Sequence, residues 1–216
     1  MGVRFSHGLQ KKLHVMKILI IATPRSGSTA LTNALAKLLK CRKYHEPYNY
    51  MHPSLASQRY PEELPDPVVV KTIFIQLPKH LEKGITNSIN FYQKEIKKFD
   101  RVILLSRKDI KAAYESFNYR AKSDPLGSWH SPYSYIETEF DKKLFNDYLK
   151  WTSSLIKFGE DNNLDVTWYE DLYSNNIEIL QGIVDNLKLG FNAEQFQTEL
   201  NYTPKYRVDT SKQVLI

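Results

Sequence analysis

The sequence predicts an α/β protein, a three-layer sandwich with a central, mostly parallel sheet. Three observations carry this prediction. Short apolar runs rich in branched residues recur along the chain, as is typical of strands that are buried on both faces. Longer stretches with helical spacing of apolar residues lie between them. The two kinds of segment alternate, which is the order that parallel sheets require.

The elements are expected in a regular order. The first strand is Lys17–Ala22, and a helix follows it over 30–39. Further strands are expected over 68–74, 101–106 and 164–169. Further helices are expected over 81–99, 109–121, 137–162 and 176–187. The segment 41–67 contains five prolines and is expected to be a long loop, and the residues after 187 are expected to form a weakly patterned tail.

Length and composition predict one domain. The chain has 216 residues, of which 42% are hydrophobic, enough for a single sizeable core. We expect an N-terminal extension over 1–15 and one domain over 16–216 that includes the C-terminal tail. No apolar run approaches the roughly 18 residues that suggest a membrane-spanning helix. The single cysteine, Cys41, fits a reducing compartment, so a cytoplasmic location is expected.

The formal net charge of +6 is compatible with an anionic cofactor, with nucleic acid or with a membrane surface. No nucleic-acid-binding motif accompanies the charge, so nucleic acid is not expected as a partner. The six histidines show no metal-ligand spacing, so no metal is expected. The oligomeric state stays open.

The passage from the first strand to the first helix predicts an anion site. It reads Thr23-Pro24-Arg25-Ser26-Gly27-Ser28-Thr29. A buried strand that feeds a tight loop and a helix aims backbone N–H groups and the positive end of the helix dipole at one point. Hydroxyl groups and the Arg25 guanidinium suit phosphate or sulfate. The alternative is a capped helix start without a ligand.

This loop lacks the lysine of a Walker A sequence, Gly-x-x-x-x-Gly-Lys-Ser/Thr. The segment 23–31 instead resembles the 5′-phosphosulfate loop of the sulfotransferases, which transfer a sulfuryl group from 3′-phosphoadenosine 5′-phosphosulfate (PAPS). The resemblance implies a P-loop-like sulfotransferase fold and an EC 2.8.2 type of enzyme that releases adenosine 3′,5′-bisphosphate without a metal. It implies cofactor contacts at Arg25, Ser26, Gly27, Ser28 and Thr29.

A second anion site is expected after the strand 101–106. Arg107 directly follows this strand, and Ser116 lies nine residues later on the next helix. The pair resembles the 3′-phosphate site of the same family, an Arg followed eight or nine residues later by Ser. Together with Arg120 and Trp129, this spacing is closest to the bacterial trehalose-sulfotransferase-like branch. Whether Arg107 or Lys108 makes the contact is left open, and a simple helix cap is the alternative.

Sulfuryl transfer needs a base for the acceptor proton and positive charge at the leaving oxygen. The family often has Glu followed by Pro after the first helix, so the resemblance implies Glu46 as the base, with His45 as the second choice. Lys71 resembles the family's strand Lys-Thr that faces the acceptor. Arg25 would steady the leaving group. The alternative for Glu46 is a structural ion pair with a Lys or Arg.

The remaining resemblances are weaker. The segment 168–172 resembles the family's Tyr-Glu-Asp-Leu segment, in which Glu170 and Asp171 are interpreted as structural residues at a helix entry. Lys205 and Arg207 in the C-terminal tail could close over the 3′-phosphate, as basic C-terminal residues do in many members, but this match is not specific. The expected acceptor is a hydroxyl or amine of a small molecule, glycan or lipid. Two alternatives stay open: a P-loop-like nucleotide or metabolite kinase, and a basic nucleic-acid-binding module.

Overall fold

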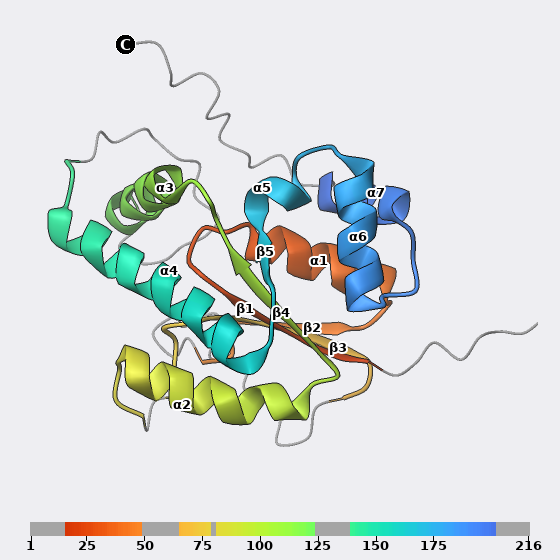
Figure 1. Cartoon of the computed structure of the whole chain (residues 1–216), viewed down its shortest axis with the longest axis horizontal. Helices are drawn as coiled ribbons and strands as arrows, with labels where there is room; N and C mark the ends of the chain where they lie inside the picture. Colours follow the sequence, from red (N-terminus) through yellow and green to blue (C-terminus); the bar gives the residue numbers. More distant parts are fainter. Residues whose placement is uncertain (1–15, 49–64, 79–80, 124–138, 202–216) are drawn as a thin grey trace, which may run out of the picture.

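The computed structural model describes residues 16–48, 65–78, 81–123 and 139–201. Helices cover both faces of a central sheet of five strands, all of them parallel (Figure 1). The predicted α/β class and the central parallel sheet are therefore confirmed. The expected extension over 1–15 and the basic residues Lys205 and Arg207 lie outside the described residues.

The sheet has the strand order β2-β3-β1-β4-β5, with β1 at its centre. In chain order, the strands are β1 Lys17–Ala22, β2 Arg42–His45, β3 Val68–Ile73, β4 Arg101–Ser106 and β5 Val166–Trp168. Side chains of β1 point alternately to the two faces of the sheet, and both faces are covered, which explains why the strand is apolar from Ile18 to Ala22. Ile18 and Ile20 pack into the core on one face, whereas Leu19 and Ile21 pack into the core on the other.

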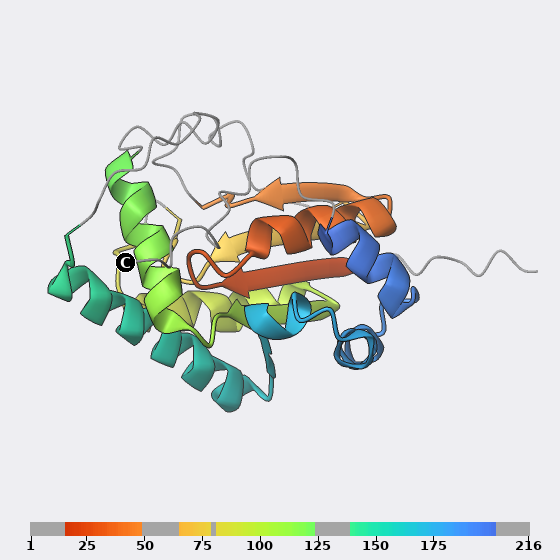
Figure 2. The same cartoon turned by 90° about the horizontal axis from the view of Figure 1, so that it is seen from above.

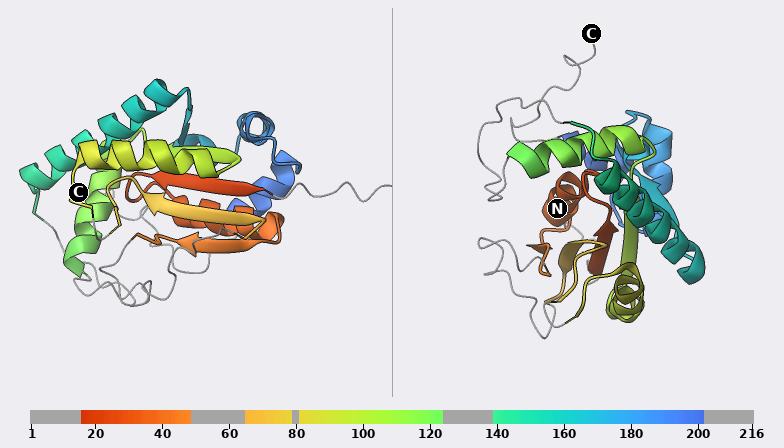
Figure 3. Two further views of the ribbon diagram at one scale, coloured as in Figure 1. Left: turned by 90° about the horizontal axis from the view of Figure 1, so that it is seen from below. Right: turned by 90° about the vertical axis from the view of Figure 1, so that its left-hand side faces the viewer.

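Two helix layers enclose the sheet. The helices are α1 Ser28–Leu38, α2 Ile85–Glu95, α3 Ile110–Ser123, α4 Lys142–Asn162, α5 Tyr169–Leu172, α6 Ile177–Leu187 and α7 Ala193–Asn201, and a short 3₁₀ helix, Ile96–Lys98, follows α2. The helices α1, α6 and α7 share one core, and α2 and α4 share the other (Figure 3). The helices α6 and α7 lie toward the end of the sheet opposite to α3, which packs against α4 (Figure 2).

Two sequence predictions are wrong. The segment 41–67 was expected to be a loop throughout, but its residues 42–45 form β2. This strand lies at the sheet edge with Arg42 and Lys43 exposed, so it lacks the apolar run of a buried strand. The expected tail contains α7, in which Ala193, Phe196 and Leu200 are buried on the shared face. This short helix carries only three buried apolar positions, which is a weak periodic signal.

Some boundaries also differ from the expectation. Helix α4 begins at Lys142, later than expected, because the Asp141 carboxylate accepts a hydrogen bond from Leu144 N at 2.9 Å and caps the helix there. Strand β5 spans only Val166–Trp168, since the chain turns into α5 at Tyr169. In the described part of the chain, no helix is long and apolar enough to cross a membrane.

The carboxyl ends of all five strands lie at one edge of the sheet because the strands are parallel. The chain leaves β1 toward the α1 layer and leaves β3 toward the α2 layer. Neighbouring strands whose connections go to opposite faces create a crevice at their carboxyl ends, which is where ligands bind in open α/β sheets. The β1–α1 loop, Glu46 and Arg107, which the sequence predicts as site residues, all follow strand ends at this edge.

Candidate active site

The loop between β1 and α1 depends on two residues with left-handed backbone. Arg25 has φ of 62° and Gly27 has φ of 79°. A Cβ atom at Gly27 would lie 2.7 Å from Cδ2 of Tyr169, so only glycine fits at this position. Gly27 is the N-cap residue, and α1 starts at Ser28 with its first backbone N–H groups at the carboxyl edge of the sheet.

Hydrogen bonds from distant elements hold this loop. The Tyr148 hydroxyl of α4 donates to Pro24 O at 2.6 Å, and burial raises the pKa of Tyr148, which keeps it a donor. The hydroxyls of Thr23 and Ser106 lie 3.1 Å apart and join the ends of β1 and β4. Ser26 Oγ donates to Thr23 O at 2.8 Å. The Ser26 hydroxyl therefore stabilises the loop itself.

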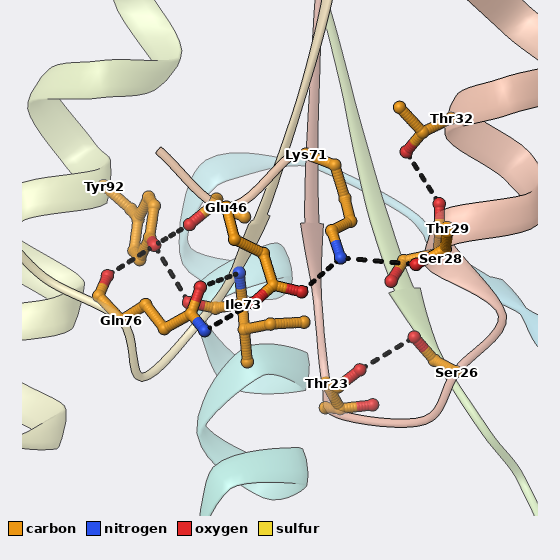
Figure 4. A network of polar contacts seen from close by, with 11 residues as sticks. Thr23, Ser26, Ser28, Thr29, Thr32, Glu46, Lys71, Ile73, Gln76 and Tyr92 are labelled. Atoms are coloured by element: carbon orange, nitrogen blue, oxygen red, sulfur yellow. Dashed lines mark hydrogen bonds and ion pairs between the residues drawn. The ribbon is translucent and has the colours of Figure 1, made fainter. Parts of the chain in front are cut away.

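A buried ion pair joins the ends of β2 and β3. Lys71 Nζ donates to Glu46 Oε1, and the two residues are only 3% and 7% exposed (Figure 4). The register pairs His45 with Lys71, so Glu46 follows directly beyond the end of β2. Lys71 Nζ also lies 3.4 Å from Thr29 Oγ1 in the first turn of α1. One ammonium group thus links the carboxylate to the helix start.

Gln76, which is not among the residues expected from the sequence, completes this network. Its Nε2 donates to Glu46 Oε2 at 2.8 Å, so the two carboxylate oxygens of Glu46 have different partners (Figure 4). The signal available in the sequence was a polar residue in an apolar stretch just beyond Lys71 and Thr72. That signal does not say which way the side chain points.

His45 lies beside the same pair. Burial lowers the pKa of His45 to about 4, with further contributions from the charges of Lys71 and Lys43, while the Glu46 charge acts in the opposite direction. The imidazole is therefore neutral at neutral pH, and it has the protonation state that a base requires.

A second group of polar residues lies at the ends of β4 and β5, and Arg107 is its central member. Its Cζ lies 4.4 Å from the centre of the Tyr169 ring, and its Nε lies 3.8 Å from Glu170 Oε1. The Nε atom is buried and has no hydrogen-bond partner among the residues that the structure describes. A buried donor without an acceptor is costly, and a phosphate or sulfate oxygen would satisfy it.

The neighbours of Arg107 are engaged with one another. Glu170 accepts hydrogen bonds from the backbone N–H groups of Lys108, at 2.9 Å, and Asp109, at 3.1 Å. Lys108 Nζ lies 2.7 Å from Asp171 Oδ1. Glu170 and Asp171 thus fasten the start of α3 to α5. Because the Lys108 ammonium is already paired, the geometry favours Arg107 as the group that would meet an anion.

A hydrogen bond between residues far apart in the sequence links the β1–α1 loop to α3, the helix that follows Arg107. Arg25 Nε donates to Ser116 Oγ at 2.9 Å, although the residues are 91 positions apart. Arg25 comes from the β1–α1 loop and Ser116 from α3, so the loop and the second predicted anion site are direct neighbours. The structure therefore brings Arg25, Ser28, Thr29, Glu46, Lys71, Arg107 and Ser116 to one edge of the sheet.

A cavity of about 520 Å³ lies at the opposite edge of the sheet, lined among others by Arg101, Asp165 and Leu187, and it contains none of the site residues. Among the residues that the structure describes, no group of three or more His, Cys, Asp or Glu side chains could hold a metal ion.

No protein-family model matches the chain, and a search of curated proteins finds no match.

Proposed function

We propose that this protein is a sulfotransferase that moves a sulfuryl group from PAPS to a hydroxyl or amine of a small-molecule, glycan or lipid acceptor. The observation that carries the proposal is the meeting of Glu46, Lys71 and the first turn of α1 at the switch point of the sheet. This arrangement combines a base, a cation and a set of backbone N–H donors. The proposal includes a P-loop-like sulfotransferase fold.

The 5′-phosphosulfate end of the donor would lie at the start of α1. Ser28 and Thr29 would contribute hydroxyl groups there, together with the backbone N–H groups of the first turn. The lysine that the loop lacks has a substitute in Lys71, which reaches Thr29 from β3. Lys71 and Arg25 would stabilise the negative charge that develops on the leaving phosphate oxygen.

Glu46 would accept the proton of the acceptor. The acceptor oxygen or nitrogen forms a bond to sulfur while the bond from sulfur to the 5′-phosphate oxygen breaks, and adenosine 3′,5′-bisphosphate leaves. The ion pair with Lys71 favours the ionised form of the Glu46 carboxylate, which is the form that a base needs. The same ion pair is what a purely structural carboxylate would make, so activity measurements on a Glu46 variant decide between the two roles.

The 3′-phosphate of the donor would meet Arg107 and Ser116. The buried Nε of Arg107 supports this assignment because a phosphate oxygen would supply an acceptor. The Ser116 hydroxyl accepts from Arg25, and its own O–H remains a donor for a phosphate oxygen. Arg25 would then connect both anionic ends of one ligand.

A nucleotide or metabolite kinase is the second candidate. The position of Lys71 near the start of α1 supports the kinase as well as the sulfotransferase, since a β-phosphate would also be stabilised there. Thermal-shift measurements separate the two functions. Adenosine 3′,5′-bisphosphate at 100 times its Kd should stabilise the fold by about 2.7 kcal/mol, and ATP with Mg²⁺ should stabilise it far less. The reverse order of the two ligands would favour the kinase.

Calorimetry on Arg25→Ala then tests the site, with Arg42→Ala as the matched control because Arg42 is an exposed arginine on the edge strand β2. Arg25→Ala should weaken binding of adenosine 3′,5′-bisphosphate by about 1.5–3 kcal/mol, the range for a hydrogen bond to a charged group. Equal affinities for both variants would remove the β1–α1 loop from the site. A screen of acceptors with labelled PAPS follows for the protein that binds the bisphosphate.

A further inference from the structure

We infer that Gln76 is a positioning residue that holds the carboxylate of Glu46 in one orientation from the side opposite to Lys71. The inference rests on the proposed function, in which Glu46 is the base. Lys71 Nζ binds Oε1 of Glu46, and Gln76 Nε2 binds Oε2 at 2.8 Å (Figure 4). Two donors on two different oxygens fix the plane of the carboxylate, which one donor alone would leave free to rotate.

The orientation of the Gln76 amide is itself determined by its neighbours. Gln76 Oε1 accepts from Ile73 N at 3.4 Å, which leaves the amide nitrogen directed at Glu46. The backbone of Gln76 is held as well, because Gln76 N donates to Ile73 O at 2.8 Å in the turn that follows β3. The turn therefore fixes the Gln76 side chain so that its NH₂ group donates to Glu46.

Tyr92 of α2 supports this turn from the face of the sheet that α2 and α4 cover. Its hydroxyl lies 2.8 Å from Gln76 O, 3.0 Å from Ile73 O and 2.8 Å from Thr72 Oγ1. The Tyr92 side chain is fully buried, and burial raises its pKa, so the hydroxyl stays protonated and uncharged. A fully packed ring that carries a polar tip is a rigid support for the backbone that carries Gln76.

The charges around Glu46 show what Gln76 adds. Lys71 faces the carboxylate from β3, His45 precedes it at the end of β2, and Tyr92 approaches from α2. His45 is neutral because burial lowers its pKa to about 4. Gln76 contributes a hydrogen-bond donor that carries no charge, so it stabilises the ionised carboxylate and leaves the net charge of the Glu46–Lys71 pair unchanged.

The first test needs no substrate. The ¹³C signal of the Glu46 carboxyl group, assigned by its loss in Glu46→Gln, is followed during a pH titration of the whole protein. In Gln76→Met, which keeps the length of the side chain but removes the donor, the titration midpoint of this signal should move about one pH unit higher. The exposed glutamine of α2 supplies the control Gln93→Met, which should leave the midpoint unchanged. An unchanged midpoint in Gln76→Met overturns the inference.

The second test separates positioning from a loss of structure. With an acceptor from the screen, Gln76→Met should lower kcat about tenfold, while the affinity for adenosine 3′,5′-bisphosphate by calorimetry stays within about twofold. Gln76→Glu, which keeps the shape but replaces the donor by a second carboxylate, should lower kcat further. Parallel losses of kcat and affinity overturn the positioning role. If the unmodified protein does not bind the bisphosphate, the proposed function fails, and the ¹³C titration still decides whether Gln76 holds Glu46.

Discussion

The two sides of the site differ in how completely their polar groups are satisfied. At the ends of β2 and β3, Glu46 and Lys71 are buried and bonded to each other, and each has a further polar neighbour in Gln76 or Thr29. At the ends of β4 and β5, Arg107 contacts a ring and a distant carboxylate, and its buried Nε has no acceptor in the part of the chain described.

The difference separates two tasks of such a site. A side whose hydrogen bonds are complete before a ligand arrives needs no rearrangement during a reaction, which suits the chemical step. A side with an unsatisfied donor gains most when an anion arrives, which suits binding. We therefore expect substitutions near Glu46 to affect turnover and stability, and substitutions near Arg107 to affect affinity.

The largest effect is expected for Glu46→Gln. If Glu46 takes the acceptor proton, this variant should keep the fold and the affinity for adenosine 3′,5′-bisphosphate but lose about 10²–10⁴-fold in turnover. Initial rates with labelled PAPS measure the loss, and His45→Ala should lose less. Near-normal turnover in Glu46→Gln together with an inactive His45→Ala would transfer the role to His45.

Lys71→Met should unfold more easily, because it leaves the Glu46 carboxylate buried without its cation. Breaking a buried pair in this way costs about 3–5 kcal/mol, and urea denaturation measures it. The double variant Lys71→Met/Glu46→Leu should recover most of the loss, since no uncompensated charge remains. Lys43→Met is the control, because Lys43 is an exposed lysine on β2. A single variant as stable as the control would mean that this side is not preorganised by the ion pair.

Arg107→Ala tests the other side of the comparison. It should weaken binding of adenosine 3′,5′-bisphosphate by about 1.5–3 kcal/mol, and it should affect adenosine 5′-phosphosulfate, which has no 3′-phosphate, much less. Ser116→Ala should show the same selectivity. Calorimetry with both ligands measures it, and Lys111→Ala on the exposed face of α3 is the control. Equal losses for the two ligands would make Arg107 and Ser116 structural residues.

The smallest effect concerns the pH dependence of stability. The pKa of His45 falls from 6.5 to about 4 in the folded protein, so between these values the unfolded chain binds a proton that the folded chain does not. Stability should therefore decrease as the pH falls through this window, by about 2 kcal/mol between pH 7 and pH 5 from this residue alone. Urea denaturation at both pH values checks it, and His45→Asn should remove this part of the decrease.

The central strands could be predicted because burial on both faces leaves a plain signal. Strands β1 Lys17–Ala22 and β4 Arg101–Ser106 contain apolar runs for that reason, and their bounds agree with the sequence prediction. The edge strand Arg42–His45 has two exposed residues and no apolar run, so its sequence resembles a loop. A strand can be recognised in a sequence when most of its side chains are buried and therefore apolar. An edge strand has few buried side chains, so its sequence lacks this pattern.

The site could be predicted only in part. The residues at strand ends could be selected, because the carboxyl edge of a parallel sheet gathers them whatever the details of packing. The partners could not, since Arg25 and Ser116 meet across 91 positions and the Tyr148 hydroxyl reaches Pro24 from α4. The direction of the Gln76 side chain depends on a turn that only the folded backbone defines. Local patterns therefore identify candidates, and tertiary packing decides what they touch.

The central position of β1 has a consequence for synthesis. This strand is made first, but its neighbours β3 and β4 come later, and β4 begins roughly eighty residues beyond the end of β1. At translation rates of about 5–20 residues per second, the second edge of β1 waits about 4–16 seconds for its partner. During that time an apolar strand with an open edge is exposed to other chains, and a nascent chain released before Arg101 should aggregate.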